Sequence, residues 1–155
     1  MAGAKPVVFR SIDELERAVG DDLGASDWHE ITQAQIQAFA DATGDHQWVH
    51  VDVERAARSS FGATIAHGYL TLSMLSGFVE QIYEVRGLEL VMNYGLQSVR
   101  FPTPVPVGSR IRAHARLLRL ERRDSGVKMI MDVVVELEGS TKPACVAETV
   151  TWLVP

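Results

Sequence analysis

Two neighbouring runs of alternating apolar and polar side chains constrain the fold of this chain most strongly. In residues 110–117, apolar side chains alternate with arginine and histidine, and in residues 127–137 every second residue is valine, methionine or leucine. A period of two is the spacing of side chains on one face of a β-strand. Asp124-Ser125-Gly126 lies between the runs and is typical of a tight turn. The pattern therefore predicts an antiparallel hairpin with one buried face.

Two further strands are predicted on either side of this hairpin, at about residues 91–101 and 144–153. The segment between the first of them and the hairpin, residues 101–108, contains three prolines, which cannot donate to a strand ladder. We interpret that segment as an extended connection. Together the four strands predict an antiparallel sheet.

A helix is predicted upstream of the strands, from His67 to Val85. Its apolar residues are distributed most of the way round a helix, so we expect it to be largely buried. At 1.5 Å per residue it would be roughly 25–28 Å long, enough to cross a small domain. These apolar residues are Leu70, Leu72, Met74, Leu75, Phe78, Val79 and Ile82.

The fold class that follows is α+β, with a long central helix wrapped by a curved antiparallel β-sheet. A single sheet covers only one side of such a helix, so the apolar surface on the other side of the helix stays exposed. We therefore expect a homodimer, which would cover that surface.

Shorter elements are predicted before the long helix. The sequences Ser11–Glu14 and Thr32–Gln35 fit capping boxes, which predict a helix over about residues 12–19 and another that ends at Gly44. Residues 27–31 alternate and predict a short strand. Asp52 can cap a third short helix that runs to about residue 59.

Size and composition exclude several classes of protein. The 155 residues favour one domain over 1–155. A net charge of −5 argues against a nucleic-acid partner, and no stretch approaches the ~20 apolar residues needed to span a membrane. The single cysteine, Cys145, permits no internal disulfide, and no long apolar run precedes Ser11. We therefore expect a cytoplasmic protein without nucleic-acid or membrane partners.

Seven of the 15 basic residues lie between Arg110 and Lys128. One interpretation is a solvated strand face. The other is a landing site for the phosphates of a ligand, because arginine binds phosphate through a planar fork of donors.

The segment Gly44-Asp45-His46-Gln47-Trp48-Val49-His50 carries the candidate chemistry. It places a carboxylate and an imidazole five residues apart, just after a predicted helix end. An acid–base pair aimed at one point can move a proton to or from a bound water. Two structural alternatives remain open: Asp45 could satisfy backbone donors after the helix, and His50 could pack in the core.

A metal site is the third possibility for this segment, with His46, His50 and Asp52 as ligands. The His-x-x-x-His spacing binds metal when it lies on one helix face, whereas here it follows Gly44 in a predicted loop. No third nitrogen or sulfur ligand has suitable local spacing. We expect neither a metal nor a cofactor.

Three segments resemble one family. Residues 39–52 resemble the hydratase motif of the MaoC-like dehydratases, the (R)-specific enoyl-CoA hydratases, which has a Gly-Asp pair, a histidine five residues after the aspartate and an aspartate two residues further on. Residues 61–68 are similar to the family's approach to its central helix, and residues 100–108 to its segment after a strand. The resemblance covers about residues 31–108 and is greatest to small single-domain members found in actinobacteria.

The resemblance implies the hot-dog fold and the hydration of a trans-2-enoyl thioester. It implies that Asp45 and His50 hold the attacking water and that the backbone N–H of Gly68 binds the thioester oxygen. Free N–H groups and the positive end of the dipole at a helix start suit that last role. Coenzyme A would be part of the substrate. Three points stay open: which side chain is the base, how long the acyl chain is, and whether the carrier of the acyl group is coenzyme A or acyl-carrier protein.

The sequence departs from the family at Gln47-Trp48, where Asn-Pro is usual. Gln47 could replace the asparagine in part, and Trp48 could pack the loop from beneath; the change bears on substrate range and rate. His67 is interpreted as structural, positioning the turn into the helix. Two other functions remain open on the same fold: an acyl-CoA thioesterase, and a non-catalytic acyl-thioester-binding or partner subunit.

Overall fold

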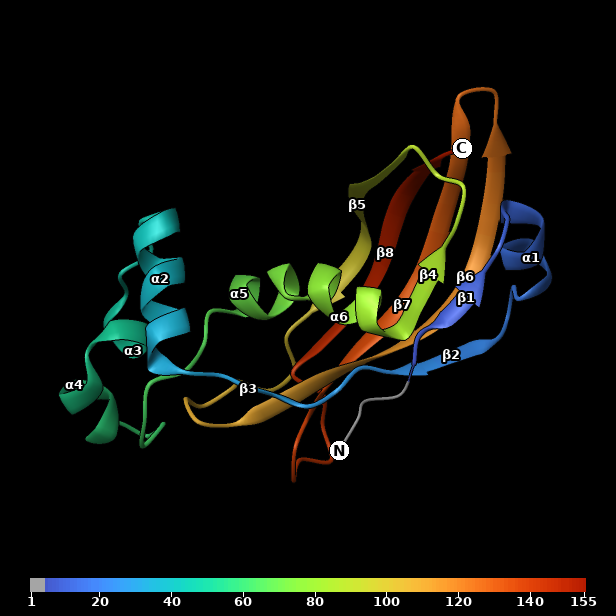
Figure 1. Cartoon of the computed structure of the whole chain (residues 1–155). Helices are drawn as coiled ribbons and strands as arrows, with labels where there is room; N and C mark the ends of the chain where they lie inside the picture. The colour runs from blue at the N-terminus through green and yellow to red at the C-terminus, as the bar shows by residue number, and fades with distance from the viewer. Residues whose placement is uncertain (1–4) are drawn as a thin grey trace.

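The structure of the chain is a computed structural model, and it describes residues 5–155. Its main feature is a curved antiparallel sheet in the strand order β2-β6-β7-β8-β5, with β3 paired to β6 (Figure 1). The strands are β2 (Asp22–Ala25), β3 (His29–Glu30), β5 (Leu90–Arg100), β6 (Arg110–Arg123), β7 (Gly126–Leu137) and β8 (Cys145–Val154). The four strands predicted from the sequence are confirmed to within one residue at most ends.

The central hairpin pairs β6 with β7 in the register that the alternation predicts. Ile111 lies opposite Leu137, and the register shifts between Leu117 and Arg119. This bulge explains why the strict alternation in the sequence stops at Leu117. At the turn, Gly126 has φ 151°, and a β-carbon there would lie 2.5 Å from the carbonyl oxygen of Leu153, so only glycine fits.

The predicted helix is present as two consecutive pieces, α5 (Gly68–Ser73) and α6 (Leu75–Ile82), which lie across the concave side of the sheet (Figure 1). Its last predicted turn is instead β4 (Tyr83–Val85), which pairs in parallel with β1 (Val7–Phe9). The α+β class is confirmed. The expectation of a largely buried helix is wrong for the single chain, since Tyr69 is 69% exposed.

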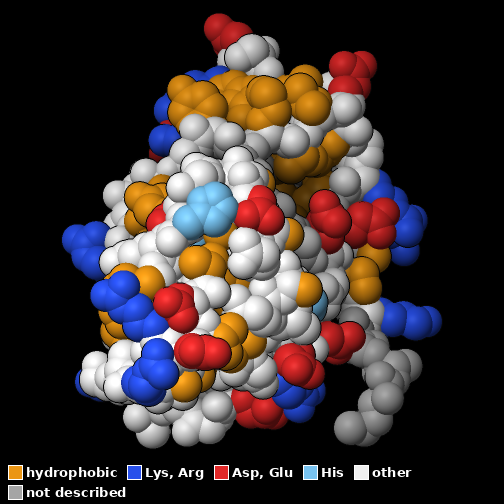
Figure 2. Space-filling view, turned by 90° about the vertical axis from the view of Figure 1, so that its left-hand side faces the viewer, with side chains coloured by type: hydrophobic (Ala, Val, Ile, Leu, Met, Phe, Trp, Pro, Cys, Tyr) orange, Lys and Arg blue, Asp and Glu red, His pale blue; other side chains and the backbone are white. Residues whose placement is uncertain are grey.

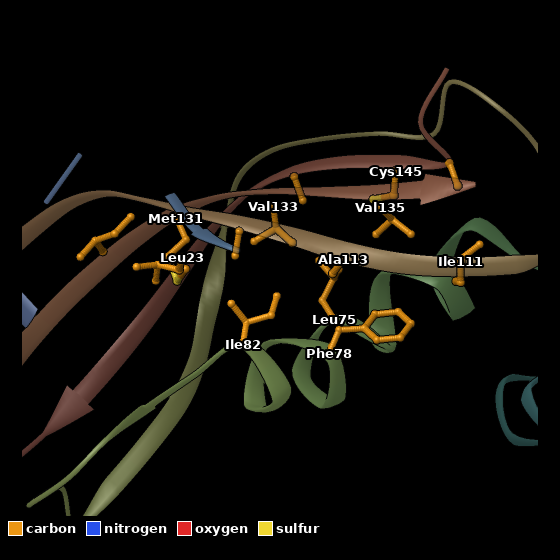
Figure 3. Packing of buried hydrophobic residues seen from close by; sticks show 14 of the residues in the cluster. Leu23, Leu75, Phe78, Ile82, Ile111, Ala113, Met131, Val133, Val135 and Cys145 are labelled. Carbon is orange, nitrogen blue, oxygen red and sulfur yellow. The ribbon is translucent and has the colours of Figure 1, made fainter. Parts of the chain in front are cut away.

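One face of α6 builds the core with the sheet. Leu75, Phe78 and Ile82 point toward side chains of β6 and β7, among them Ala113 and Val133 (Figure 3). Their spacing of three and four residues keeps them on one helix face. Cys145 lies in the same core, and burial raises the pKa of its thiol to about 11. A packed small residue is therefore the interpretation of Cys145 that fits.

The remaining helices lie mostly to one side of the sheet. They are α1 (Ile12–Arg17), α2 (Gln33–Thr43), α3 (Trp48–Val51) and α4 (Val53–Ala57), of which α2, α3 and α4 form a group beyond the start of α5 (Figure 1). The capping box at Thr32 and Gln35 and the cap at Asp52 are present. The short helix α3 is not predicted from the sequence. No helix of the described residues is long and apolar enough to span a membrane.

The basic residues between Arg110 and Lys128 form ion pairs rather than an open cationic surface. Arg110 pairs with Glu138 and Arg112 with Glu136 across the hairpin. Four of the other five also pair with carboxylates, and Arg116 donates to a backbone carbonyl. The interpretation as a solvated strand face therefore fits, because a phosphate would have to displace these carboxylates.

Phe78→Ala should destabilise the fold strongly. Phe78 is buried where α6 meets the sheet, and removal of such a ring costs about 3–5 kcal/mol of unfolding free energy, including the cavity that it leaves. Tyr69→Ala, on the exposed side of α5, should change the unfolding free energy by about 0.5 kcal/mol or less. Urea unfolding at one protein concentration measures both. Equal losses for the two variants would contradict this account of the core.

Candidate active site

Asp45 stands at the point where α2 ends. Gly44 has φ 79°, a left-handed conformation that glycine adopts without strain, and its N–H donates to the carbonyl of Ala40. The chain therefore turns sharply, and Asp45 leaves the helix axis. Its carboxylate accepts the N–H of Gln47 at 3.3 Å and is 54% exposed.

His50 is held on α3, which begins two residues earlier at Trp48. The sequence predicted a loop here; the structure has one helical turn, which directs the ring inward, so that His50 is only 8% exposed. Its Nδ1 lies 2.7 Å from the carbonyl oxygen of Ile65. A carbonyl only accepts, so Nδ1 carries the hydrogen, and the neutral ring keeps a free lone pair on Nε2. That nitrogen can take a proton.

Gln33 supports the backbone of His50. Its side-chain Nε2 donates to the carbonyl of His50 at 2.9 Å, and its Oε1 accepts the hydroxyl of Thr64. Thr64 directly precedes Ile65, whose carbonyl holds the His50 ring. One amide side chain from the start of α2 thus connects α3 with the segment before α5. Sequence reasoning missed Gln33 and Thr64, because a contact over 31 residues leaves no local pattern.

His67 is the third polar side chain of the site. It is 3% exposed, and its ring stacks on that of His50 with centroids 3.7 Å apart and planes 23° from parallel. Its Nε2 lies 2.9 Å from the carbonyl oxygen of Asp45. The prediction of a structural role at the turn into the helix did not include these contacts with Asp45 and His50. Its position directly before Gly68 was the available signal.

Asp45, His50 and His67 come together, with one side-chain atom of each within 4.8 Å of the others. Such a set has the composition of a metal site. The stacking makes a poor one, because nearly parallel imidazole planes direct their lone pairs side by side rather than toward one tetrahedral centre. The ligand set considered from the sequence is not assembled, since His46 pairs with Asp41 and Asp52 caps α4.

Gly68 begins α5 on the wall of a cavity of about 370 Å³ that it shares with His50. The N–H groups of Leu70 and Thr71 donate to the carbonyl of His67, whereas no acceptor for the Gly68 N–H is found among residues 5–155. A β-carbon at Gly68 would lie 3.0 Å from the Phe101 ring. The cavity thus holds an imidazole and a free amide, with mostly apolar side chains around them.

The loop departs from the family pattern in a visible way. The side chain of Gln47 makes no hydrogen bond to any described residue, so it does not replace an asparagine inside the loop. Trp48 is the first residue of α3, and the guanidinium of Arg55 lies 4.3 Å from its ring centroid. A cation–π contact between α3 and α4 therefore stiffens this region in place of a proline.

A second, exposed pair restrains the same loop. His46 Nε2 lies 2.8 Å from Asp41 Oδ1, across the turn at Gly44. The hydrogen bond raises the pKa of His46 above its usual value and lowers the pKa of Asp41. The charged contact therefore persists from below the usual carboxyl range, where Asp41 is finally protonated, to above the usual imidazole range, where His46 loses its proton.

Comparison with known proteins identifies relatives over almost the whole chain. A 3-hydroxyacyl-thioester dehydratase Z of Mycobacterium tuberculosis is 54% identical over 143 residues, which are 92% of this chain and 95% of that protein. An (R)-hydratase of A. caviae involved in PHA biosynthesis is 27% identical, with a TM-score of 0.70 over 86% of this chain and 94% of that one.

A C-terminally truncated HadBC complex of Mycobacterium tuberculosis, a 3R-hydroxyacyl-ACP dehydratase, shares the fold with a TM-score of 0.67. It is 14% identical, over 87% of this chain and 99% of that one. The family model for the MaoC like domain matches residues 14–138, which is most of the chain. With a hot-dog fold and the motif residues gathered at one site, this chain belongs to the MaoC-like dehydratase family.

Proposed function

We propose that this protein catalyses the reversible, (R)-specific hydration of trans-2-enoyl-CoA to (R)-3-hydroxyacyl-CoA. One observation carries the proposal: a side-chain atom of Asp45 lies within 4.8 Å of one of His50, and His50 lines one cavity together with Gly68. The relative that is 54% identical is named a 3-hydroxyacyl-thioester dehydratase, which is the reverse direction of the same class of reaction. Coenzyme A belongs to the substrate, and no separate cofactor takes part.

Asp45 and His50 would hold and activate the water. Its oxygen forms a bond to the β-carbon while the carbon–carbon double bond breaks, and a proton adds to the α-carbon. Between them the two side chains remove one proton from the water and return one to the α-carbon, so the pair ends each turnover unchanged. The Nδ1–H···O=C bond to Ile65 leaves Nε2 of His50 free for this transfer.

Gly68 would stabilise the charge that develops. Attack at the β-carbon moves electrons onto the thioester oxygen, and the free Gly68 N–H at the start of α5 is suited to bind it. The loss of one such donor typically costs roughly 3–4 kcal/mol of barrier. The donor is a backbone group, so a side-chain substitution does not remove it. A side chain at position 68 would instead crowd the ring of Phe101, which lies 3.0 Å from the place of a β-carbon.

Two other functions predict different products. A thioesterase on this fold would release a free thiol, which a thiol-trapping reagent detects. A non-catalytic partner subunit would bind enoyl-CoA and never convert it. The proximity of Asp45 to His50, which lines the cavity, favours the hydratase over an inert subunit.

Replacement of either member of the pair should abolish most of the activity. We expect Asp45→Asn and His50→Gln each to lower kcat for enoyl-CoA hydration by roughly 10²–10⁴-fold, the usual contribution of a positioned acid or base. The measurement is the loss of absorbance of the enoyl thioester, with chiral analysis of the product. Asp124→Asn and His114→Gln, remote from the site on the β6–β7 hairpin, are the matched controls. Unchanged rates in both site variants would refute the mechanism.

We also propose that the protein is a homodimer joined along β5. In the described part of the chain this strand ends the sheet, pairs with β8 alone and exposes several apolar side chains. They are Leu90, Val91, Met92, Tyr94 and Leu96. A long apolar edge strand is a ready template for another strand, and a second copy of the chain would cover it. Figure 2 shows hydrophobic side chains gathered at the top of one face, with a hollow beneath them.

Lysine on the exposed edge should separate the subunits, since a charged side chain resists burial in a strand pair. We expect the wild-type protein to have twice the chain mass of 17.1 kDa in light scattering, and the double variant Tyr94→Lys/Leu96→Lys to have the single mass. Leu118→Lys, on an exposed part of the inner strand β6, should remain dimeric. A monomeric wild-type protein, or a dimeric double variant, would rule out this interface.

A further inference from the structure

We propose that His67 is a positioning residue that fixes Asp45, His50 and Gly68 relative to one another; this inference rests on the proposed function. Among residues 5–155, it is the one side chain in contact with Asp45 and His50 whose own residue is also joined to Gly68 by a peptide bond. Neither the sequence motif nor the comparisons assign it a role.

Asp45 depends on His67 for its connection to the rest of the molecule. The hydrogen bonds that Asp45 makes to Thr43 and Gln47 lie within two residues of it along the chain. Among the described residues, the bond from His67 Nε2 to the Asp45 carbonyl is the only hydrogen bond that reaches Asp45 from a distant segment. Without it, an exposed loop would hold the carboxylate by local contacts alone.

His50 depends on the same ring in a different way. The bond from Nδ1 to Ile65 restrains the His50 imidazole at one nitrogen. The ring of His67, with its centroid 3.7 Å away, packs on the face of the His50 ring and limits its tilt out of the plane. The direction of the lone pair on Nε2 therefore follows from the stack.

The His67 ring is itself held firmly. It is 3% exposed and lies between His50 and the ring of Phe39, whose centroid is 5.1 Å away. Its backbone carbonyl accepts the N–H groups of Leu70 and Thr71, which anchors it at the first turn of α5. A buried ring with packed neighbours has few alternative rotamers, so it can transmit the position of α5 to the acid–base pair.

Loss of positioning affects the rate more than binding. A displacement of about 1 Å of reacting groups can cost roughly 10²-fold in rate. Because His67 does not line the cavity and reaches it only through its contacts with Asp45 and His50, we expect kcat to fall while KM changes little.

Two variants separate the two contacts. His67→Phe keeps a flat ring for the stack and removes the donor to Asp45, whereas His67→Gln can place an amide N–H near the position of Nε2 and removes the ring. Using a trans-2-enoyl-CoA as substrate, we expect each variant to lower kcat by about 10–100-fold with KM within about 3-fold. Ile36→Val, which trims a buried side chain of α2 away from the contacts described for the site, is the control for destabilisation alone and should keep full kcat.

A double variant tests whether His67 acts through its neighbour. In an Asp45→Asn background, the effect of His67→Phe on kcat should shrink to about 2-fold, because residues that act as a unit are not additive. Full additivity, or kcat within 2-fold of wild type in both His67 variants, would overturn the proposal. If the wild-type protein does not hydrate enoyl-CoA, the proposed function fails, and the positioning role is then decided by the NMR test below.

Nitrogen NMR of the histidine rings in the wild-type protein needs neither activity nor a folded variant. The proposal requires the hydrogen of His67 on Nε2, where it bonds to the Asp45 carbonyl, and the hydrogen of His50 on Nδ1. A His67 ring with its hydrogen on Nδ1 only would overturn it, because the bond to Asp45 could not exist.

Discussion

The packing of one face of α5 and α6 against the sheet is the constraint on which the site depends. Leu75, Phe78 and Ile82 pack α6 against β6 and β7. This packing fixes the position of α5, which directly precedes α6 and begins at Gly68. Gly68 and His67 are at that first turn. The proposed catalytic groups lie on α3 and the loop before it, outside the sheet, and they are held by contacts with this helix start, with the segment before it and with Gln33 of α2.

The polar contacts of the site have a common logic. Backbone carbonyls fix the rings: Ile65 binds Nδ1 of His50, and Asp45 binds Nε2 of His67. Each ring is thereby held by a group that cannot change its protonation state. The groups proposed to exchange protons are held less tightly: Nε2 of His50 has no hydrogen bond to a described residue, and the Asp45 carboxylate lies 4.0 Å from Nε2 of His67.

Local patterns in the sequence were sufficient for most of the fold and for the motif residues. The alternation of β6 and β7, the capping box at Thr32 and the glycine after α2 each depend on a few adjacent residues. The roles of His67 and Gln33 depend on contacts across 22 and 17 residues, which have no period or spacing. The helix was expected to be largely buried because its apolar side chains could not be divided, from the sequence, between the face that packs in the core and the face that is exposed in the single chain.

The central claim is that Asp45, His50 and Gly68 act on one thioester. The most direct measurement is a crystal structure of the Asp45→Asn variant with a trans-2-enoyl-CoA bound. We predict the thioester oxygen about 3 Å from the Gly68 nitrogen, with the β-carbon facing residue 45 and Nε2 of His50. A thioester oxygen bound by another donor, or an acyl chain that leaves the β-carbon away from His50, would contradict it.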